Sequence, residues 1–215
     1  MTKETNLLLP GPQGQLEAIL HQGDPALPMV VICHPHPLHQ GTMHNKVVYM
    51  LSRAFAELSC SSLRFNYRGV GKSSGRYGKG EGESEDLLAV ITWLHQHHSV
   101  HSLWLAGFSF GCYVVGRAAQ QHPDKLQQLF MVAPAVNHLS FKQFDRFDYP
   151  LHIIHGDQDE VADYQAAYHW CQQLQSPAEF ITVTGSSHFF HKKLLDLRQI
   201  IGDISASILD SSTIF

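Results

Sequence analysis

The chain has 215 residues, of which 44% are hydrophobic and 16% are charged, so a disordered or highly solvated chain is excluded. Fifteen Lys and Arg residues against 19 Asp and Glu residues give a formal net charge of −4, which argues against a dedicated binder of nucleic-acid backbones. This length predicts one domain, residues 1–215. The absence of a long apolar run, of a signal-like N-terminus and of paired cysteines predicts a cytoplasmic protein with reduced thiols that does not bind a membrane.

Short apolar runs alternate with segments of helical periodicity along the chain. Apolar runs of strand length are found at residues 5–9, 15–20, 28–33, 62–66, 103–106, 129–133, 151–154 and 180–183. Apolar residues at helical spacing are found near residues 47–58, 84–94, 110–121, 162–174 and 194–208. This alternation predicts a mostly parallel, twisted sheet of about seven to eight strands with helices on both faces. The first two runs predict a hairpin at one edge of the sheet.

A glycine-rich loop runs from Tyr67 to about Gly82 and precedes one of the predicted helices. Ser84 is a good N-cap residue, so we expect the helix to begin there, with acidic neighbours suited to the positive end of the helix dipole. The loop contains the sequence R-G-V-G-K-S-S-G. Only one residue separates its first two glycines, so it does not match the phosphate-binding pattern G-x-x-x-x-G-K-[ST], and no nucleotide binding is expected.

The most informative pentapeptide follows the predicted strand 103–106 and reads Gly107-Phe-Ser-Phe-Gly111. In a G-x-S-x-G turn between a strand and a helix, the serine hydroxyl projects at the top of the sheet and the glycines allow close backbone approach. Such a pentapeptide is also compatible with an ordinary glycine-containing turn. Its position at a strand-to-helix junction favours the catalytic interpretation, with Ser109 as the nucleophile.

A serine nucleophile needs an imidazole to accept its proton and a carboxylate to orient that imidazole. Asp157, Asp159 and Glu160 follow the predicted strand 151–154, and His188 follows the predicted strand 180–183. Open α/β sheets form their sites at the carboxyl ends of strands. We therefore expect one of these acids and His188 to lie next to Ser109.

The order of serine, acid and histidine resembles that of the α/β-hydrolases. The chain is most similar to their small members without a lid domain, such as dienelactone hydrolase-like proteins and bacterial carboxylesterases, and the resemblance covers residues 34–191. It implies the α/β-hydrolase fold. It also implies a serine hydrolase that cleaves small acyl esters or lactones through an acyl-enzyme on Ser109, with amides or thioesters as further possible substrates.

The family motifs select particular residues of the triad. The family's G-x-x-D pattern selects Asp159 as the acid, with Asp157 or Glu160 as the alternatives. The context Gly-Ser-Ser-His-Phe-Phe is close to the family's G-x-x-H-x-F and selects His188 as the base. The resemblance thus implies a triad of Ser109, Asp159 and His188.

The loop after the predicted strand 28–33 reads H-P-H-P-L-H. In the α/β-hydrolases this loop donates one backbone N–H to the oxyanion hole, and the residue after the nucleophile, here Phe110, donates the other. Proline has no N–H, which leaves His36 and Leu38 as the donors, and His36 is favoured because it follows the position of the family's usual His-Gly pair. Pro35 departs from that pair, but the loop and the G-x-M-x-N-K stretch after it resemble a bacterial subgroup of predicted serine hydrolases.

Sixteen histidines make a metal-dependent hydrolase the main alternative. His34, His36 and His39 have the H-x-H-x-x-H spacing of metallo-β-lactamase zinc sites. Leu38 stands where that signature needs an aspartate, and the intervening prolines restrict how the imidazoles can converge. We therefore expect neither a metal nor another cofactor. A non-catalytic binding protein with the same fold is the second alternative, which the presence of all three triad residue types disfavours.

The segment between the predicted strands 129–133 and 151–154 is too short for a lid domain. Phe141, Phe144 and Phe147 recur in it at three-residue spacing, and further phenylalanines flank the triad residues, at positions 108, 110, 189 and 190. These rings either line a small acyl pocket or pack in the core. The expected partners are a small acyl substrate and water, with no nucleic acid and no membrane.

Overall fold

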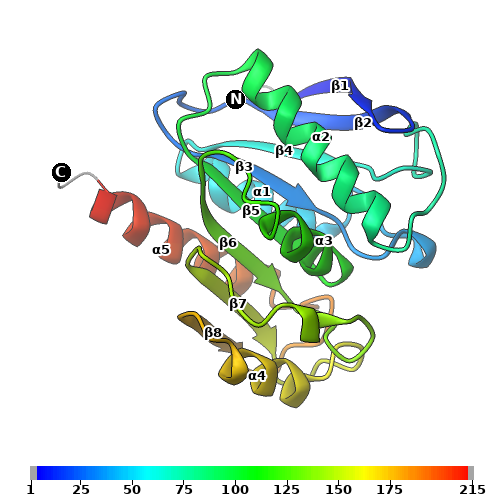
Figure 1. Ribbon diagram of the computed structural model, residues 1–215. Helices are drawn as coiled ribbons and strands as arrows, with labels where there is room; N and C mark the ends of the chain where they lie inside the picture. Colours follow the sequence, from blue (N-terminus) through cyan, green and yellow to red (C-terminus); the bar gives the residue numbers. More distant parts are fainter. Residues whose placement is uncertain (1–3, 213–215) are drawn as a thin grey trace.

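The computed structural model describes the backbone of residues 4–212, which contain one eight-stranded sheet and five α-helices (Figure 1). The strands are β1 (Glu4–Gly11), β2 (Gly14–His21), β3 (Met29–Cys33), β4 (Ser61–Phe65), β5 (Leu103–Phe108), β6 (Leu126–Val132), β7 (Leu151–Gly156) and β8 (Ala178–Val183). The α-helices are α1 (Lys46–Glu57), α2 (Glu81–His97), α3 (Phe110–Ala119), α4 (Tyr164–Gln173) and α5 (Leu194–Ser212). Two short 3₁₀ segments, η1 (Pro37–His39) and η2 (Phe141–Gln143), lie in loops.

The strand order across the sheet is β1-β2-β4-β3-β5-β6-β7-β8. β1 and β2 form an antiparallel hairpin at one edge, in which Glu4 lies opposite His21 and Gly11 opposite Gly14. β2 also pairs with β4 in the antiparallel direction, and every other neighbouring pair of the sheet is parallel. The mostly parallel sheet and the N-terminal edge hairpin predicted from the sequence are confirmed.

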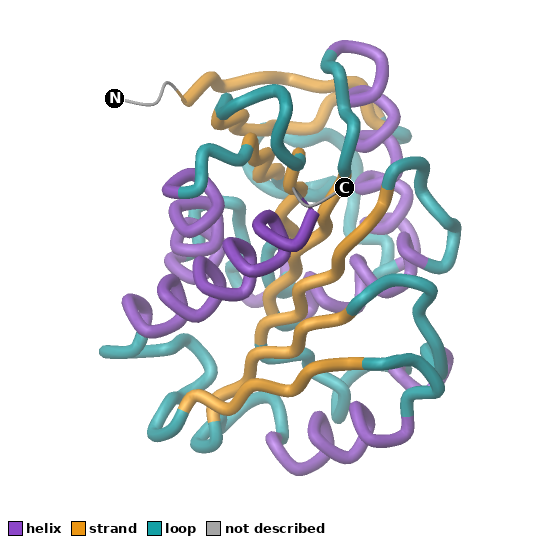
Figure 2. The backbone as a smooth tube through the Cα atoms, turned by 90° about the vertical axis from the view of Figure 1, so that its left-hand side faces the viewer, coloured by secondary structure: helices purple, strands orange, loops and turns teal. Residues whose placement is uncertain are grey.

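Helices cover both faces of the sheet (Figure 2). On one face α1 and α5 pack against each other and against the sheet through buried apolar side chains, which include Val48, Leu51, Phe55, Leu197 and Ile201. On the other face α2, α3 and α4 contribute a second buried cluster, which includes Leu87, Leu94, Val114, Val115 and Trp170. The central strands are buried on both sides, which explains why their sequences are nearly continuous in apolar residues.

The helix α2 begins at Glu81, with Gly80 as its N-cap, and not at Ser84 as predicted. The carboxylate of the buried Glu83 accepts the backbone N–H groups of Gly78 and Gly80, both at 2.7 Å. This acidic side chain satisfies the N-cap backbone from within the first turn, so the helix starts earlier. Ser84 lies inside the helix and donates its hydroxyl to the Gly80 carbonyl at 2.7 Å.

β5 lies at the centre of the sheet and extends further than predicted. Its ladder with β3 continues to the pair Cys33 and Gly107, and its ladder with β6 continues to Phe108 and Val132. β6 begins at Leu126, three residues before its predicted start. The residue that follows β5 is therefore held at the carboxyl edge of the sheet by strands on both sides.

The apolar segments are built into the sheet and the helices that cover it. Among residues 4–212, no helix is both long and apolar enough to cross a membrane. The four cysteines, Cys33, Cys60, Cys112 and Cys171, are buried and free of disulfides. Burial raises the pKa of the Cys33 thiol to about 12, so this residue stays protonated inside the core.

Candidate active site

Ser109 occupies the tight turn between β5 and α3, with φ of 55° and ψ of −115°. Its backbone N–H donates to the carbonyl of Val132 at 2.8 Å. A Cβ atom on Gly107 would lie 2.5 Å from the backbone of Gly111, and one on Gly111 would lie 2.4 Å from the carbonyl oxygen of Cys33. Both glycines are therefore required by close main-chain approach, and the turn holds Ser109 just beyond the carboxyl end of β5.

His188 and Asp159 meet Ser109 at this edge of the sheet. The Nε2 atom of His188 lies 3.1 Å from Oγ of Ser109, and Nδ1 of His188 lies 2.8 Å from Oδ2 of Asp159. The other carboxylate oxygen of Asp159 accepts the backbone N–H groups of Val161 and Ala162 at 2.8 and 2.7 Å. An ionised carboxylate only accepts hydrogen bonds, so Nδ1 of His188 carries the proton and Nε2 is free to accept one.

The three acidic side chains after β7 have three different partners. Asp159 bonds to the His188 ring. Asp157 accepts the backbone N–H of Gly185 at 2.6 Å, and Glu160 accepts the backbone N–H of His188 at 3.2 Å. Of the three candidates left open by the residues alone, Asp159 is the one in contact with the imidazole, while Asp157 and Glu160 hold the backbone of the loop that carries His188.

A second buried imidazole lies beside Asp159. Nδ1 of His155 lies 3.0 Å from the carbonyl oxygen of Gly156 and 3.9 Å from Oδ2 of Asp159. Burial lowers the pKa of His155, and the neighbouring carboxylate opposes this shift. The His155 ring is therefore held in its neutral form beside Asp159, whose side chain is also fully buried.

His36 and Phe110 lie in the wall of the same site, and the backbone N–H of each has no hydrogen-bond acceptor among residues 4–212. Phe110 is the first residue of α3, so its N–H points out of the helix N-terminus. The N–H of Leu38, the alternative donor, is bonded to the ring Nδ1 of His36 at 3.2 Å. The geometry therefore favours His36 over Leu38 as the loop residue with a free N–H.

The histidines of the H-x-H-x-x-H segment have separate partners. His34 is fully buried, and its two ring nitrogens bond to main-chain atoms, the carbonyl of Pro35 at 2.7 Å and the N–H of Tyr67 at 3.2 Å. Both ring nitrogens of His36 also have partners, and its ring packs edge-on against that of His39. In the part of the chain that the structure describes, no three His, Cys, Asp or Glu side chains are grouped closely enough to hold a metal ion.

Ser109 and His188 line a cavity of about 560 Å³. One part of its wall is apolar and is formed by Phe110, Ala135, Leu139, Val161 and Phe189. Another part is polar and is formed by His36, His39, Gln40, Asn45 and His138. Among the described residues, no Lys, Arg, Asp or Glu side chain lines this cavity. The site thus offers apolar surface and neutral hydrogen-bonding groups next to the serine.

The phenylalanines divide between the core and the cavity. Phe141, Phe144 and Phe147 are almost fully buried and pack with α3 and α4, so the packing interpretation is correct for this trio. Phe110 and Phe189 line the cavity. Phe108 and Phe190, the remaining two candidates, are completely buried on the α1 and α5 side of the sheet.

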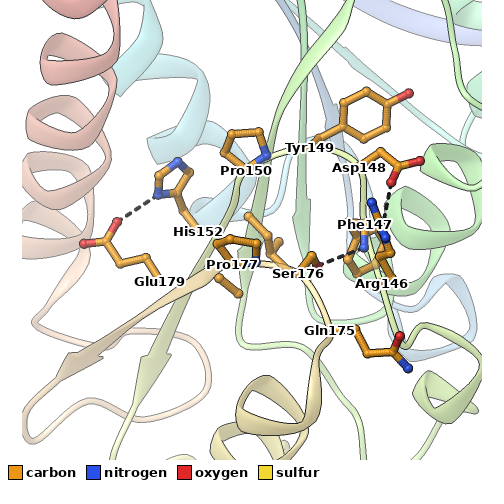
Figure 3. Close-up of a pocket in the computed structure, with 12 residues that line it drawn as sticks. Arg146, Phe147, Asp148, Tyr149, Pro150, His152, Gln175, Ser176, Pro177 and Glu179 are labelled. Atoms are coloured by element: carbon orange, nitrogen blue, oxygen red, sulfur yellow. Dashed lines mark hydrogen bonds and ion pairs between the residues drawn. The ribbon is translucent and has the colours of Figure 1, made fainter.

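A larger hollow of about 730 Å³ lies at the amino ends of β7 and β8, the opposite end of the strands from Ser109 (Figure 3). Its polar side chains pair with each other: Arg146 with Asp148 at 3.0 Å, and His152 with Glu179 at 2.9 Å. Its one serine, Ser176, accepts a backbone N–H and has no imidazole partner among the described residues. This hollow therefore lacks the arrangement that the smaller cavity possesses.

Several residues near the site were not identified from the sequence, among them His138, Val161 and Tyr77. His138 and Val161 line the cavity, and Tyr77 bonds to the ring of His36 at 3.0 Å. Val161 lies two positions after Asp159 in the same loop, so its place near the site could have been predicted from the sequence. Tyr77 and His138 reach the site from loops without regular spacing, and nothing in the residue pattern distinguishes them from their neighbours.

The comparisons with known proteins agree on one fold. Residues 28–149 match the family model described as alpha/beta hydrolase fold. An alpha-beta serine hydrolase homologue from Coxiella burnetii is 44% identical, with a TM-score of 0.88 over 94% of this chain and 97% of that chain. A serine hydrolase without a lid from Xanthomonas campestris is 39% identical, with a TM-score of 0.85 over 94% of this chain and 93% of that chain.

A dienelactone hydrolase from Anabaena variabilis is also similar in structure, with a TM-score of 0.79 over 94% of this chain and 96% of that chain. It is 14% identical in sequence. At that identity the similarity shows a shared fold and carries no information on substrate.

Proposed function

Because the chain belongs to the alpha/beta hydrolase fold family, we propose that it is a serine hydrolase that cleaves small acyl esters or lactones through an acyl-enzyme on Ser109. The observation that carries this proposal is the continuous contact from Asp159 through His188 to Ser109, at 2.8 and 3.1 Å. These lengths are within the range in which a nucleophile and its base share a proton. In this arrangement Ser109 is the nucleophile, His188 is the base and Asp159 is the acid that orients the base.

In the proposed reaction, Nε2 of His188 removes the hydroxyl proton of Ser109 while Oγ attacks the acyl carbonyl carbon. The imidazolium that forms is stabilised by the buried carboxylate of Asp159 and then gives its proton to the leaving alcohol. Water enters, loses a proton to Nε2 and attacks the acyl-enzyme, and the acid is released with Ser109 restored. Each step transfers one proton through the same nitrogen, so the site needs no other acid or base.

The tetrahedral intermediates place a negative charge on the former carbonyl oxygen. We propose that the free backbone N–H groups of His36 and Phe110 stabilise this oxyanion, because both line the cavity beside Ser109 and lack another acceptor in the described chain. The N-terminus of α3 adds the positive end of a helix dipole at the same place. Removing one such donor costs on the order of 3–4 kcal/mol in other acyl-transfer enzymes.

The cavity wall supports an uncharged substrate. With no acidic, lysine or arginine side chain around it, the cavity has no fixed ion-pair partner for a charged acyl group. Its apolar part, around Phe110, Leu139 and Phe189, is suited to a short acyl chain or a small ring, and its imidazole and amide groups are suited to neutral oxygen atoms. Amides and thioesters are less well supported, since nothing in the wall is specific for a nitrogen or sulfur leaving group.

We further propose that residues 1–215 act as a single domain without a lid domain. The segment between β6 and β7 is anchored in the core through Phe141, Phe144 and Phe147 and is therefore not free to open and close over the cavity. Activity should then rise smoothly with the concentration of a sparingly soluble ester. An abrupt increase at the concentration where the ester forms micelles would contradict this proposal.

The direct test is covalent labelling with a fluorophosphonate, read by intact mass and peptide mapping. One adduct on Ser109, absent in Ser109→Ala, is expected, together with turnover of a short-chain p-nitrophenyl ester that the same substitution abolishes. Turnover should persist in the presence of a chelator, whereas its loss would favour the metal-dependent alternative. A folded wild-type protein that neither reacts with the label nor hydrolyses esters would favour the non-catalytic binding protein.

A further inference from the structure

The side chain of His36 connects the loop after β3 with the glycine-rich loop before α2. Its Nδ1 atom accepts the backbone N–H of Leu38 at 3.2 Å, so the imidazole is the N-cap of the short η1 segment. Its Nε2 atom lies 3.0 Å from the hydroxyl of Tyr77. One ring thus joins two loops that are 41 positions apart in the sequence.

These contacts determine which nitrogen carries the proton. A backbone N–H can only donate, so Nδ1 of His36 is the acceptor and has no proton. In a neutral imidazole the proton then resides on Nε2 and is donated to the oxygen of Tyr77. Burial, with a smaller contribution from the neighbouring His39, lowers the pKa of His36 and keeps the ring in this neutral form. Tyr77 and Leu38 therefore fix both the tautomer and the orientation of the ring.

Tyr77 is itself held on a fixed support. The carboxylate of the fully buried Glu83 accepts the N–H groups of Gly78 and Gly80, which lie one and three positions after Tyr77. Further back in the loop, the guanidinium of Arg68 forms a two-pronged ion pair with the fully buried Asp86. The loop is therefore fastened to the first turns of α2 on both sides of Tyr77.

The rings of His36 and Tyr77 also contact the ring of Phe110, the second candidate oxyanion donor. The imidazole of His36 packs against the ring of Phe110 with 4.7 Å between centroids, and the ring of Tyr77 contacts both, 5.1 Å from His36 and 6.1 Å from Phe110. His36 and Phe110 both line the cavity, and the backbone N–H of each has no acceptor among residues 4–212. The ring contacts therefore link the side chains of the two residues that carry these donors.

We propose that Tyr77 is a positioning residue for the oxyanion hole, which acts by holding the His36 imidazole so that the backbone N–H of His36 stays directed at the reacting oxygen. The proposal rests on the proposed function, because it concerns the same acyl-transfer site. It also accounts for the choice of donor: the imidazole that Tyr77 orients occupies the N–H of Leu38, and the N–H of His36 is left for the substrate.

Tyr77→Phe tests the proposal, because it removes the hydroxyl and keeps the ring packing. We expect kcat for p-nitrophenyl butyrate to fall about tenfold with KM unchanged, since a misplaced oxyanion donor weakens transition-state binding and leaves substrate binding intact. Affinity for a trifluoromethyl ketone, which forms a tetrahedral adduct, should fall by a similar factor. Tyr149→Phe, at the opposite end of the sheet, is the matched control and should leave kcat at the wild-type value.

A second substitution separates positioning from loss of fold. In His36→Asn the side-chain oxygen can still accept the N–H of Leu38, as in an Asx turn, but the side chain is too short to reach Tyr77. The effect of Tyr77→Phe should therefore disappear in the His36→Asn background, while in the wild-type background it remains. If Tyr77→Phe acted only by loosening the loop, it would lower kcat to the same extent in both backgrounds, which would overturn the proposal.

The outcome also distinguishes this inference from the proposed function. If the wild-type protein fails to hydrolyse esters and Ser109 takes no label, the proposed function itself is wrong. If the wild-type protein is active and Tyr77→Phe retains its full kcat, or changes KM alone, the function stands and the role of Tyr77 is refuted.

Discussion

The Nε2 atom of His188 lies 3.1 Å from the Oγ atom of Ser109, although the two residues are 79 positions apart in the chain. The contact follows from the sheet. β5 and β8 run in the same direction, so the residues that follow them emerge at the same edge, and β7 between them brings Asp159 to that edge too. The site therefore depends on strand order and on the short loops that follow these strands.

Replacing the acid in contact with His188 distinguishes the three carboxylates. Asp159→Asn should reduce kcat by about 10⁴-fold, because an amide in this position favours the wrong imidazole tautomer. Asp157→Asn is the control, since Asp157 bonds only to the backbone of Gly185, and its kcat should remain close to that of the wild type. Steady-state kinetics on one short-chain ester would measure both variants. A large loss in Asp157→Asn together with an active Asp159→Asn would contradict the assignment.

The fold was largely predictable because each strand and helix has its own apolar pattern in the sequence, and the same alternation of strand and helix recurs along the chain. The β3 segment, for example, is buried on both faces, and this burial produces the short, nearly continuous apolar run expected of a covered parallel strand. The comparisons confirm the α/β-hydrolase fold and the similarity to members without a lid. The errors concern ends of elements. The start of α2 was misplaced because a buried acid, Glu83, caps it from inside the helix, and Ser84 is the more usual capping residue.

The site was predictable to the extent that its residues follow strands directly. Ser109, Asp159 and His188 each belong to a short loop at a strand end, so strand order alone places them at one edge. Tyr77 lies in a long loop whose path is set by tertiary bonds such as Arg68 with Asp86. Contacts of that kind have no periodicity, and the pairing of Tyr77 with His36 therefore leaves no trace in the sequence.

The glycines of the serine turn provide a stability test. Gly107→Ala should lower the free energy of unfolding by about 3 kcal/mol or more, because the added Cβ would meet main-chain atoms of Gly111 that cannot move away. Gly202→Ala is the matched control. It lies within α5, and a Cβ there meets nothing within 4 Å, so stability should rise by about 0.5–1 kcal/mol. Urea denaturation measures both, and a neutral Gly107→Ala would show that the turn is less tightly packed.

The half-exposed ring of Phe189 is expected to contribute to acyl binding. It lines the cavity beside His188 and is 40% exposed, so Phe189→Ala should have little effect on folding. Loss of this apolar wall should raise KM for p-nitrophenyl hexanoate by about tenfold and should raise KM for p-nitrophenyl acetate less. A tenfold change is consistent with the binding free energy of about 1–3 kcal/mol that an apolar contact in a substrate pocket contributes. Leu195→Ala, an exposed apolar residue of α5 outside the cavity, is the control. Equal changes for both esters would argue against an acyl-binding role.

The fully buried His34 should make the protein sensitive to acid. Burial lowers its pKa from 6.5 to about 3, so below pH 6.5 the unfolded chain binds a proton that the folded chain excludes. Stability from the neutral ring is therefore fully present above pH 6.5 and is lost as pH falls toward 3, with a slope of up to about 1.4 kcal/mol per pH unit. Other buried histidines whose pKa is lowered, such as His155, act in the same direction.

His34→Gln isolates this contribution, because glutamine keeps one donor and one acceptor but does not titrate. Urea denaturation of both proteins between about pH 7 and pH 4 should show a smaller loss of unfolding free energy in the variant. The difference in unfolding free energy between the two proteins at about pH 7, where His34 is uncharged in the folded chain and mostly uncharged in the unfolded chain, provides the baseline for packing changes. Parallel pH profiles for wild type and variant would mean that water reaches the ring and that His34 takes up its proton in the folded state.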